Sequence, residues 1–202
     1  MTTRGFTGRR PGADAALRLP PGQHETDDFP VLSLGPAPVI DMANWRFTLR
    51  HGARPLASWN WEQFLALPRS TWRGDIHCVT TWSKFDTVWE GVMFDDLLAA
   101  AGIAAPTGFL LAQSHDEYDT NIPVADLTGG QAMVATHFGG APLAPEHGGP
   151  ARLLVPHLYF WKSAKWLRGL KFTERDEAGF WELRGYHMRG DPWREQRYTD
   201  DD

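Results

Sequence analysis

The sequence lacks the features that mark several common classes of protein. It contains a single cysteine, Cys78, in 202 residues, so neither an internal disulfide nor a cysteine-based zinc site can form. No stretch approaches the roughly 18 consecutive apolar residues that a membrane-spanning helix requires. The formal net charge of −5 argues against a nucleic-acid surface, which needs a basic excess. We therefore predict no membrane span and no nucleic-acid partner.

Nucleotide-binding motifs are also missing. Neither GxGxxG nor GxxxxGKS/T follows any of the expected strands. Those motifs supply the backbone amides that hold a pyrophosphate at the start of a helix. A dinucleotide-binding domain or a P-loop domain is therefore not expected.

The N-terminal part, residues 1–38, is predicted to form an extended arm. It contains no apolar run of about 7–15 residues, the hallmark of a secretory signal peptide. Arg9 and Arg10 form a twin-arginine pair, but no hydrophobic segment follows them. We therefore expect a cytoplasmic protein, in which Cys78 stays reduced.

Tryptophan, glycine and proline are abundant instead. The chain carries 10 tryptophans, and its 20 glycines and 15 prolines make up about 17% of the residues, against about 12% in average proteins. Residues 39–198 form one predicted domain of alternating short strands and helices, followed by an acidic tail at 199–202. The alternation lacks the regular pacing of repeated βαβ units. This pattern predicts an α+β fold with mixed sheets and short helices.

Two helices have clear boundaries in the sequence. Asn60 and Gln63 resemble a capping box that opens a helix ending before Pro68. The apolar spacing of residues 94–101 predicts an amphipathic helix, with Gly102 as its C-terminal cap. Alternating or β-favouring runs predict strands at 45–50, 75–79, 109–112, 132–135, 152–155 and 170–173.

Cys78 is the first candidate for chemistry, and three interpretations stay open from its segment alone. A free cysteine is most often a small buried hydrophobe. It can also be a nucleophile, but adjacent side chains on a strand point to opposite faces, so His77 is poorly placed as its base. The third interpretation is a thiolate metal ligand, which suffices alone if a cofactor supplies the remaining ligands.

A local basic cluster in this acidic chain is the second candidate. Guanidinium, ammonium and hydroxyl groups are the donors that hold a phosphate or another anion. Large aromatic residues interleave the cluster and argue against a merely solvated face. The cluster comprises His147, Arg152, Lys162, Ser163 and Lys165.

Other polar residues are weaker candidates. His137, His147 and His157 recur every ten residues, but ten is no helical period, so we do not predict a three-histidine metal site. The polar segment 115–119 either lines a pocket or connects two strands, and we favour the connector.

The aromatic C-terminal segment is expected to pack back onto the domain, because a disordered tail would not carry so many large aromatic residues. His187 and Arg189 within it are either pocket residues or surface groups.

Together these residues resemble the molybdopterin-binding domain of the sulfite oxidase family, above all its short bacterial members. The order and spacing of several short blocks carry the resemblance, which spans nearly the whole chain. The blocks are His77-Cys78-Val79-Thr80, Trp89-Glu90-Gly91-Val92, His147-Gly148-Gly149-Pro150-Ala151-Arg152, Lys162-Ser163-Ala164-Lys165-Trp166-Leu167 and the closing residues 185–198.

The resemblance implies a sulfite oxidase-type fold and a molybdenum–molybdopterin cofactor. It implies that Cys78 binds molybdenum through sulfur, and that the protein catalyses two-electron oxygen-atom transfer on a small substrate. It further implies cofactor contacts from His147 and Arg152. For the phosphate end of the cofactor it implies contacts from Lys162, Ser163 and Lys165.

Two departures from the family pattern limit these expectations. Sulfite oxidases carry an arginine shortly after the ligand cysteine, whereas residues 79–84 contain none, which puts sulfite in doubt as the substrate. The chain also has no length for a haem domain, so a separate electron-transfer partner is expected. Thr80 and Trp82 are pocket candidates. The alternatives are a pterin-binding or redox-sensing protein of this fold without turnover, and a thiol-dependent enzyme.

Overall fold

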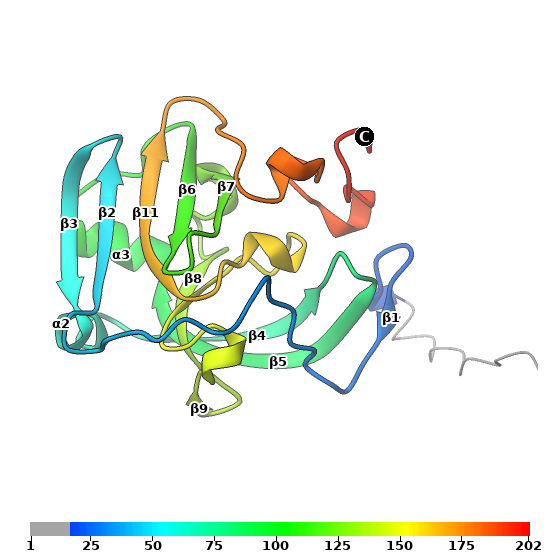
Figure 1. Ribbon diagram of the computed structural model, residues 1–202, viewed down its shortest axis with the longest axis horizontal. Coiled ribbons are helices and arrows are strands. Elements are labelled where there is room, and N and C mark those ends of the chain that lie inside the picture. The colour runs from blue at the N-terminus through cyan, green and yellow to red at the C-terminus, as the bar shows by residue number, and fades with distance from the viewer. Residues whose placement is uncertain (1–16) are drawn as a thin grey trace, which may run out of the picture.

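The computed structural model describes residues 17–202. Residues 1–16, which include Arg9, Arg10 and the start of the predicted arm, lie outside the described part of the chain. Figure 1 shows two β-sheets side by side, with the C-terminal segment folded back beside β1. The short helices lie around the sheets, and irregular loops make up much of the remaining chain.

The first sheet has six strands and is built around the longest one, β5. Strand β5 pairs with β4, with β8 and, in parallel orientation, with β1, while β10 and β9 both pair with β8. The strands are β1 (His24–Glu25), β4 (Ser70–His77), β5 (Trp82–Met93), β8 (Met133–Phe138), β9 (Ala141–Pro142) and β10 (Arg152–Leu154).

The second sheet has five strands in the order β3-β2-β11-β6-β7. Strand β11 runs parallel to β2 and antiparallel to β6, so this sheet is mixed as well. The strands are β2 (Arg46–His51), β3 (Arg54–Asn60), β6 (Phe109–Ser114), β7 (Asp119–Pro123) and β11 (Leu167–Thr173). The predicted α+β class with mixed sheets is confirmed.

Helices α2 and α3 and five short 3₁₀ turns complete the part of the fold that the structure describes. Helix α2 (Trp61–Leu65) opens with the predicted capping box, since Asn60 and Gln63 exchange side-chain and backbone hydrogen bonds. Helix α3 (Phe94–Ala101) has the predicted bounds and ends at Gly102 in the left-handed conformation. The 3₁₀ turns are η1 (Val124–Asp126), η2 (Pro145–His147), η3 (Phe160–Lys162), η4 (Glu182–Arg184) and η5 (Pro192–Arg194).

Every strand predicted from the sequence overlaps an observed strand, but five strands were missed: β1, β3, β5, β7 and the two-residue β9. The most important is β5, whose alternation of buried and exposed residues is interrupted by Asp86 at a φ of +52° and by a register shift after Glu90. The two-residue strand β1, within the predicted arm, has no periodicity to detect. Strands β3 and β7 are short and polar.

Buried side chains form two clusters. The larger one joins the second sheet to α3 and includes Phe47, Leu97 and Leu170. The smaller one lies on the first sheet and contains Cys78 and Trp82, with Phe29 of the N-terminal segment packed against it. The cysteine therefore belongs to an aromatic cluster that the N-terminal segment helps to build.

No helix among residues 17–202 is long and apolar enough to cross a membrane. The longest α-helix in this part of the chain is α3, with eight residues. Such short helices agree with a fold that depends on sheets.

A substitution at Gly91 tests how closely strands β5 and β8 pack. A β-carbon at Gly91 would lie 2.1 Å from the carbonyl oxygen of Val134, which is backbone and cannot rotate away. We expect Gly91→Ala to lower the free energy of unfolding by about 3 kcal/mol, as overpacking of a rigid site does. Chemical denaturation measures this change.

Gly35→Ala is the matched control, because nothing lies within 4 Å of its added β-carbon. We expect this substitution to change stability by less than about 0.5 kcal/mol. Equal effects of the two substitutions would contradict the close approach of β5 and β8.

Candidate functional site

A cavity of about 330 Å³ lies where the two ends of the chain meet the first sheet. Its volume lies within the range of small-molecule and cofactor sites. The N-terminal segment, the loop after β4, the β6–β7 connection, the segments around η2 and η3, and the C-terminal segment all contribute to its wall. Aromatic side chains dominate the lining, which includes Phe29, Trp82, Tyr118, Phe160, Trp161, Trp166, Trp181 and Tyr186.

Cys78 lies in the wall of this cavity, one residue beyond the end of β4. The loop from Cys78 to Thr81 closes the β4–β5 hairpin: the Thr81 amide donates to the Cys78 carbonyl over 3.0 Å, and the Cys78 amide donates to Trp82 over 2.8 Å. The thiol is 6% exposed and lies 3.1 Å from the Thr80 hydroxyl. Burial raises the pKa of Cys78, so the free thiol is protonated and unreactive at neutral pH.

His77 turns away from the cavity, as alternation along a strand predicts. Its Nδ1 atom lies 2.8 Å from the Ser83 hydroxyl, and its ring packs against Trp193. Burial lowers the pKa of His77 to about 4, so this imidazole is neutral. Because His77 points away from the cavity and its low pKa makes it a weak proton acceptor, it is poorly suited as the general base for Cys78, which weakens the interpretation as a nucleophile.

Arg152 supplies a buried positive charge in the cavity wall. The residue is 1% exposed, and its Nη1 and Nη2 atoms donate to the carbonyls of His147 and Ser163, each over 2.7 Å. Its Nε atom is buried without a partner, and no carboxylate of the described residues forms an ion pair with it. Burial lowers the pKa of Arg152 to about 9. A guanidinium left in this state favours an anionic ligand.

His147 and Lys165 lie in the same wall, beside the N-terminal segment. The His147 ring stacks on Phe29 with 4.0 Å between centroids, and burial, with the neighbouring Arg152 and Lys165 charges, lowers its pKa. Lys165 Nζ donates to the Leu32 carbonyl over 2.8 Å and to the Glu146 carbonyl over 2.7 Å. Burial lowers the pKa of Lys165 to about 8. Both residues line the cavity, and Lys165 brings an ammonium group to its wall that acceptors of the protein hold in place.

Glycines give the His147 segment its shape. Gly148 adopts a φ of +103°, and a β-carbon there would press against the Lys165 side chain at 2.9 Å. A β-carbon at Gly149 would lie 2.1 Å from the Leu143 carbonyl oxygen. Gly148 therefore lets the chain carrying His147 approach Lys165, and Gly149 lets it approach Leu143.

Ser163 lines the cavity, whereas Lys162 does not. The Ser163 hydroxyl accepts a hydrogen bond from the Val155 amide over 2.9 Å. Lys162 Nζ is fully buried on the other side of this turn, 2.6 Å from Glu182 Oε1 and 2.7 Å from Asn121 Oδ1. Of the six residues assigned from the sequence, five share the cavity and Lys162 is held by a carboxylate elsewhere.

Several wall residues were not among the site residues assigned from the sequence. Tyr186 and Trp181 come from the C-terminal segment, with ring centroids 4.9 Å apart, and Asp116 and Tyr118 come from the β6–β7 connection. Segment 115–119 was predicted to be a connector, which is confirmed, and it also contributes to the wall. Its spacing gives no sign of the cavity, because only the folded chain brings these aromatic rings together.

The remaining polar candidates lie apart from one another. His137 contacts Arg69, and His157 contacts Asp126, so only His147 of the three evenly spaced histidines reaches the cavity. The structure places the other two at separate sites.

The two candidates of the C-terminal segment are absent from the described cavity wall. Arg189 pairs with Asp126 over 3.0 Å. His187 Nδ1 accepts the backbone amides of Arg189 and Gly190. Both residues stabilise this segment rather than the cavity.

Comparison with protein families shows to which family the chain belongs. Residues 34–181 match the oxidoreductase molybdopterin binding domain. The chain belongs to this family. It is therefore a molybdopterin-binding oxidoreductase, as the resemblance of the sequence blocks to sulfite oxidases implied.

Individual proteins agree with this assignment. The chain is 43% identical to the uncharacterized oxidoreductase YuiH of Bacillus subtilis (strain 168), over 96% of this chain and 98% of that protein. It is 26% identical to the putative protein-methionine-sulfoxide reductase subunit YedZ1 of Azospira oryzae, over 75% of this chain and 57% of that protein. The sulfane dehydrogenase SoxCD of Paracoccus pantotrophus has the same fold, with a TM-score of 0.59, 23% identity and coverage of 70% of this chain and 41% of that chain.

The residues present fit a molybdopterin cofactor. Two donors in the cavity wall are buried without partners, the Nε atom of Arg152 and the Nε1 atom of Trp82. A ligand rich in acceptor atoms would satisfy both. Among residues 17–202 no three His, Cys, Asp or Glu side chains form a metal cluster, so a metal at Cys78 requires ligands from the cofactor.

Lys162 offers a test that separates a structural role from cofactor binding. Lys162→Met would leave Glu182 as an unpaired buried carboxylate, so we expect the free energy of unfolding to fall by about 3–5 kcal/mol. Chemical denaturation of the cofactor-free protein measures this loss.

Lys171→Met is the control for Lys162→Met. Lys171 and Glu177 form an exposed ion pair of 3.0 Å, and the loss of such a pair costs less than about 1 kcal/mol. Unchanged stability of Lys162→Met, combined with loss of cofactor, would instead place Lys162 at the cofactor.

Proposed function

We propose that this molybdopterin-binding oxidoreductase holds molybdenum through the Sγ atom of Cys78 and performs two-electron oxygen-atom transfer. One observation carries the proposal: a buried thiol and a buried guanidinium without a carboxylate partner face the same cavity. A metal would convert the thiol to a bound thiolate, which the raised pKa of the free thiol disfavours without a metal.

The basic residues of the cavity are assigned to the rest of the cofactor. Arg152 and His147 would hold the pterin, and Lys165 and Ser163 would hold the phosphate. Arg152 is rigid before binding, because two carbonyls already orient its guanidinium. When bound, the cofactor supplies a metal that changes oxidation state by two electrons. The protein supplies the enclosed site and its positive charge.

The substrate end of the cavity is assigned to the residues around Cys78 that the cofactor leaves free. Thr80 lies beside the thiol, and Tyr186 and Trp181 close the opposite wall. The pKa of Tyr186 is raised by burial and by the neighbouring Tyr198 and Cys78, so its hydroxyl remains a hydrogen-bond donor. It would present this donor to an oxygen atom of the substrate.

Overall oxygen-atom transfer balances as an oxide XO plus two electrons and two protons giving X and water, or as the reverse reaction. The electrons require an external carrier, because the chain contains no second redox domain in the described residues. We propose a separate electron-transfer protein, in agreement with the description of YedZ1 as a subunit. We also propose a cytoplasmic location, which remains a prediction from the sequence.

Sulfite is not proposed as the substrate. Bidentate guanidinium donors select oxyanions, and Arg152 is the single arginine in the described cavity wall, with both of its Nη atoms already bound to carbonyls. The loop after Cys78 presents Val79 and Thr80 instead. We therefore assign a small substrate other than sulfite.

Metal and pterin analysis tests the role of Cys78. Protein expressed in a host that makes molybdopterin should contain about one molybdenum per chain. Cys78→Ser should lose at least about 90% of the metal while retaining pterin, because serine cannot supply the soft thiolate. Arg152→Met should lose pterin and metal together.

Arg184→Gln is the control, since Arg184 is exposed and lies outside the cavity. Its metal content should equal that of the wild type. A Cys78→Ser variant with full molybdenum content would overturn the proposed ligand.

A redox titration tests turnover. The chemically reduced holoprotein should be reoxidised by one equivalent of a suitable oxide donor, with release of one equivalent of the deoxygenated product. The measurement follows the thiolate-to-metal absorption band while a panel of small oxides is added. If the reduced metal is not reoxidised by any donor or acceptor in the panel, the result would favour a sensor without turnover.

A further inference from the structure

Both termini of the chain hold the loop that carries Cys78. Gln23 Nε2 donates to the Cys78 carbonyl over 3.0 Å, and the His24 amide donates to the Thr81 carbonyl over 2.8 Å. From the other end of the chain, Arg197 Nη1 donates to the Val79 carbonyl over 2.6 Å. Three of the four carbonyls in this loop are therefore bound by residues from the two ends of the chain.

Arg197 is a largely buried cation whose guanidinium donates to backbone carbonyls where the two ends of the chain meet the Cys78 loop. Its side chain is 14% exposed, its Nη2 atom donates to the Pro21 carbonyl over 3.3 Å, and its guanidinium lies 5.0 Å from the centre of the Tyr159 ring. The nearest carboxylate, of Glu195, is 4.0 Å away and half exposed, so it neutralises Arg197 only weakly. The positive charge of Arg197 therefore stays largely unneutralised next to the Cys78 loop.

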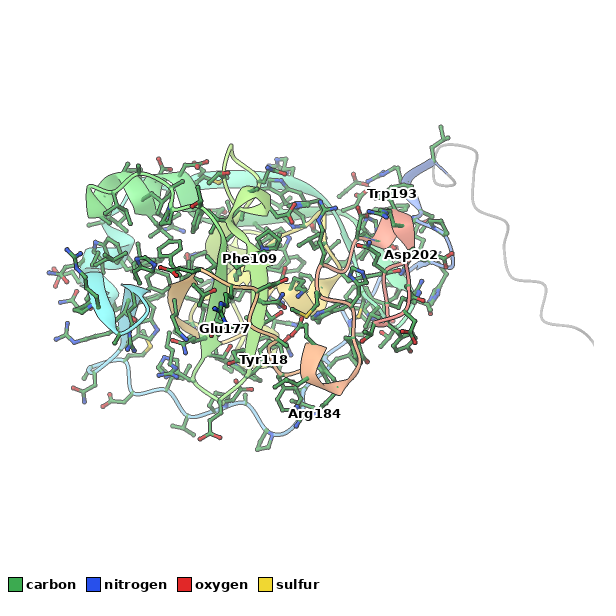
Figure 2. All side chains as sticks on the ribbon, turned by 90° about the horizontal axis from the view of Figure 1, so that it is seen from above. Phe109, Tyr118, Glu177, Arg184, Trp193 and Asp202 are labelled. Atoms are coloured by element: carbon green, nitrogen blue, oxygen red, sulfur yellow. The ribbon has the colours of Figure 1, made fainter. Side chains whose placement is uncertain are left out.

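The overall arrangement agrees with these contacts. Figure 1 shows the C-terminal end of the chain beside β1, and Figure 2 shows Trp193 and Asp202 at that same end of the molecule. Gln23 and Arg197 both lie outside residues 34–181, the part that matches the family domain. The contacts therefore come from segments outside the part of the chain that matches the family domain.

We propose that Arg197 is a positioning residue for Cys78: it fixes the Val79 carbonyl and places a positive charge beside the metal-ligand sulfur. The inference rests on the proposed role of Cys78 as the molybdenum ligand. Its two parts are separable, since the hydrogen bond sets the geometry of the loop and the charge acts on the sulfur.

A positive charge near a metal thiolate has a defined consequence. It stabilises the more negatively charged, reduced state of the site and so raises the reduction potential. The sequence lacks an arginine directly after Cys78, and Arg197 brings a guanidinium to the same loop from 119 positions further along the chain. Because Arg197 donates to a backbone carbonyl, it acts on the loop that carries Cys78.

Hydrogen exchange of the cofactor-free full chain tests the geometric part without any metal. In Arg197→Gln we expect the amides of residues 78–83 to exchange about tenfold faster, as the loss of one charge-assisted hydrogen bond predicts. Arg197→Lys keeps a donor and should lie between this variant and the wild type. Gln23→Leu removes the contact from the other terminus and should accelerate the same peptide.

Arg184→Gln is the matched control for exchange. Arg184 also binds a carbonyl, that of Phe180 over 2.7 Å, and stacks on an aromatic ring, but Figure 2 shows it away from Trp193 and Asp202. It should leave the exchange of residues 78–83 unchanged. Exchange in Arg197→Gln equal to that of the wild type, or accelerated equally throughout the chain, would overturn the geometric part.

The reduction potential of the loaded protein tests the electrostatic part. Arg197→Gln should lower the potential of the metal and shift the thiolate absorption band, whereas Arg197→Lys should stay near the wild type because it keeps the charge. Equal potentials in all three proteins would overturn this part. A protein that binds no molybdenum would overturn the proposed function instead, while the exchange result would still stand or fall on its own.

Discussion

The site depends on a buried guanidinium that the protein does not neutralise. Arg152 is enclosed among aromatic side chains. Its guanidinium carbon lies 4.1 Å from the centre of the Phe160 ring, and two backbone carbonyls accept its hydrogen bonds. Carbonyl dipoles orient the group but do not cancel its charge, so the folded chain carries an unfavourable desolvation energy at this point. An anionic cofactor would remove that penalty. The cavity is therefore most favourable energetically when it is filled.

The contrast with Lys162 shows that this arrangement is specific to the cavity. Both cations are fully buried and lie only ten positions apart, but Lys162 has Glu182 as a partner at 2.6 Å. The Lys162–Glu182 pair joins the C-terminal segment to β7, since Glu182 also accepts from Thr120 and Trp161. One buried cation thus stabilises the fold and the other is left for a ligand. Charge pattern in the sequence cannot distinguish them, because the deciding carboxylate is 20 residues further along the chain.

Local chemistry in the sequence predicted much of the fold and the centre of the site. The capping box at Asn60 and the glycine cap at Gly102 depend on neighbouring residues alone, so both helices could be placed. Strand β5 could not, because its bulges break the alternation and because two of its pairing partners, β1 and β8, come from distant segments. Five of the six predicted cofactor residues meet in the cavity, while Tyr186 was missed because only tertiary packing brings it there.

The segments on either side of the family domain contribute to the cavity wall and to the loop that carries Cys78. Phe29 stacks on His147 and packs against the cluster that contains Cys78, and the Lys165 ammonium binds the backbone of the same N-terminal segment. At the opposite end of the chain, Arg197 reaches the Cys78 loop. Because each contact ties one of these segments to a residue proposed to hold the cofactor, binding of the cofactor and ordering of the two segments should be thermodynamically coupled.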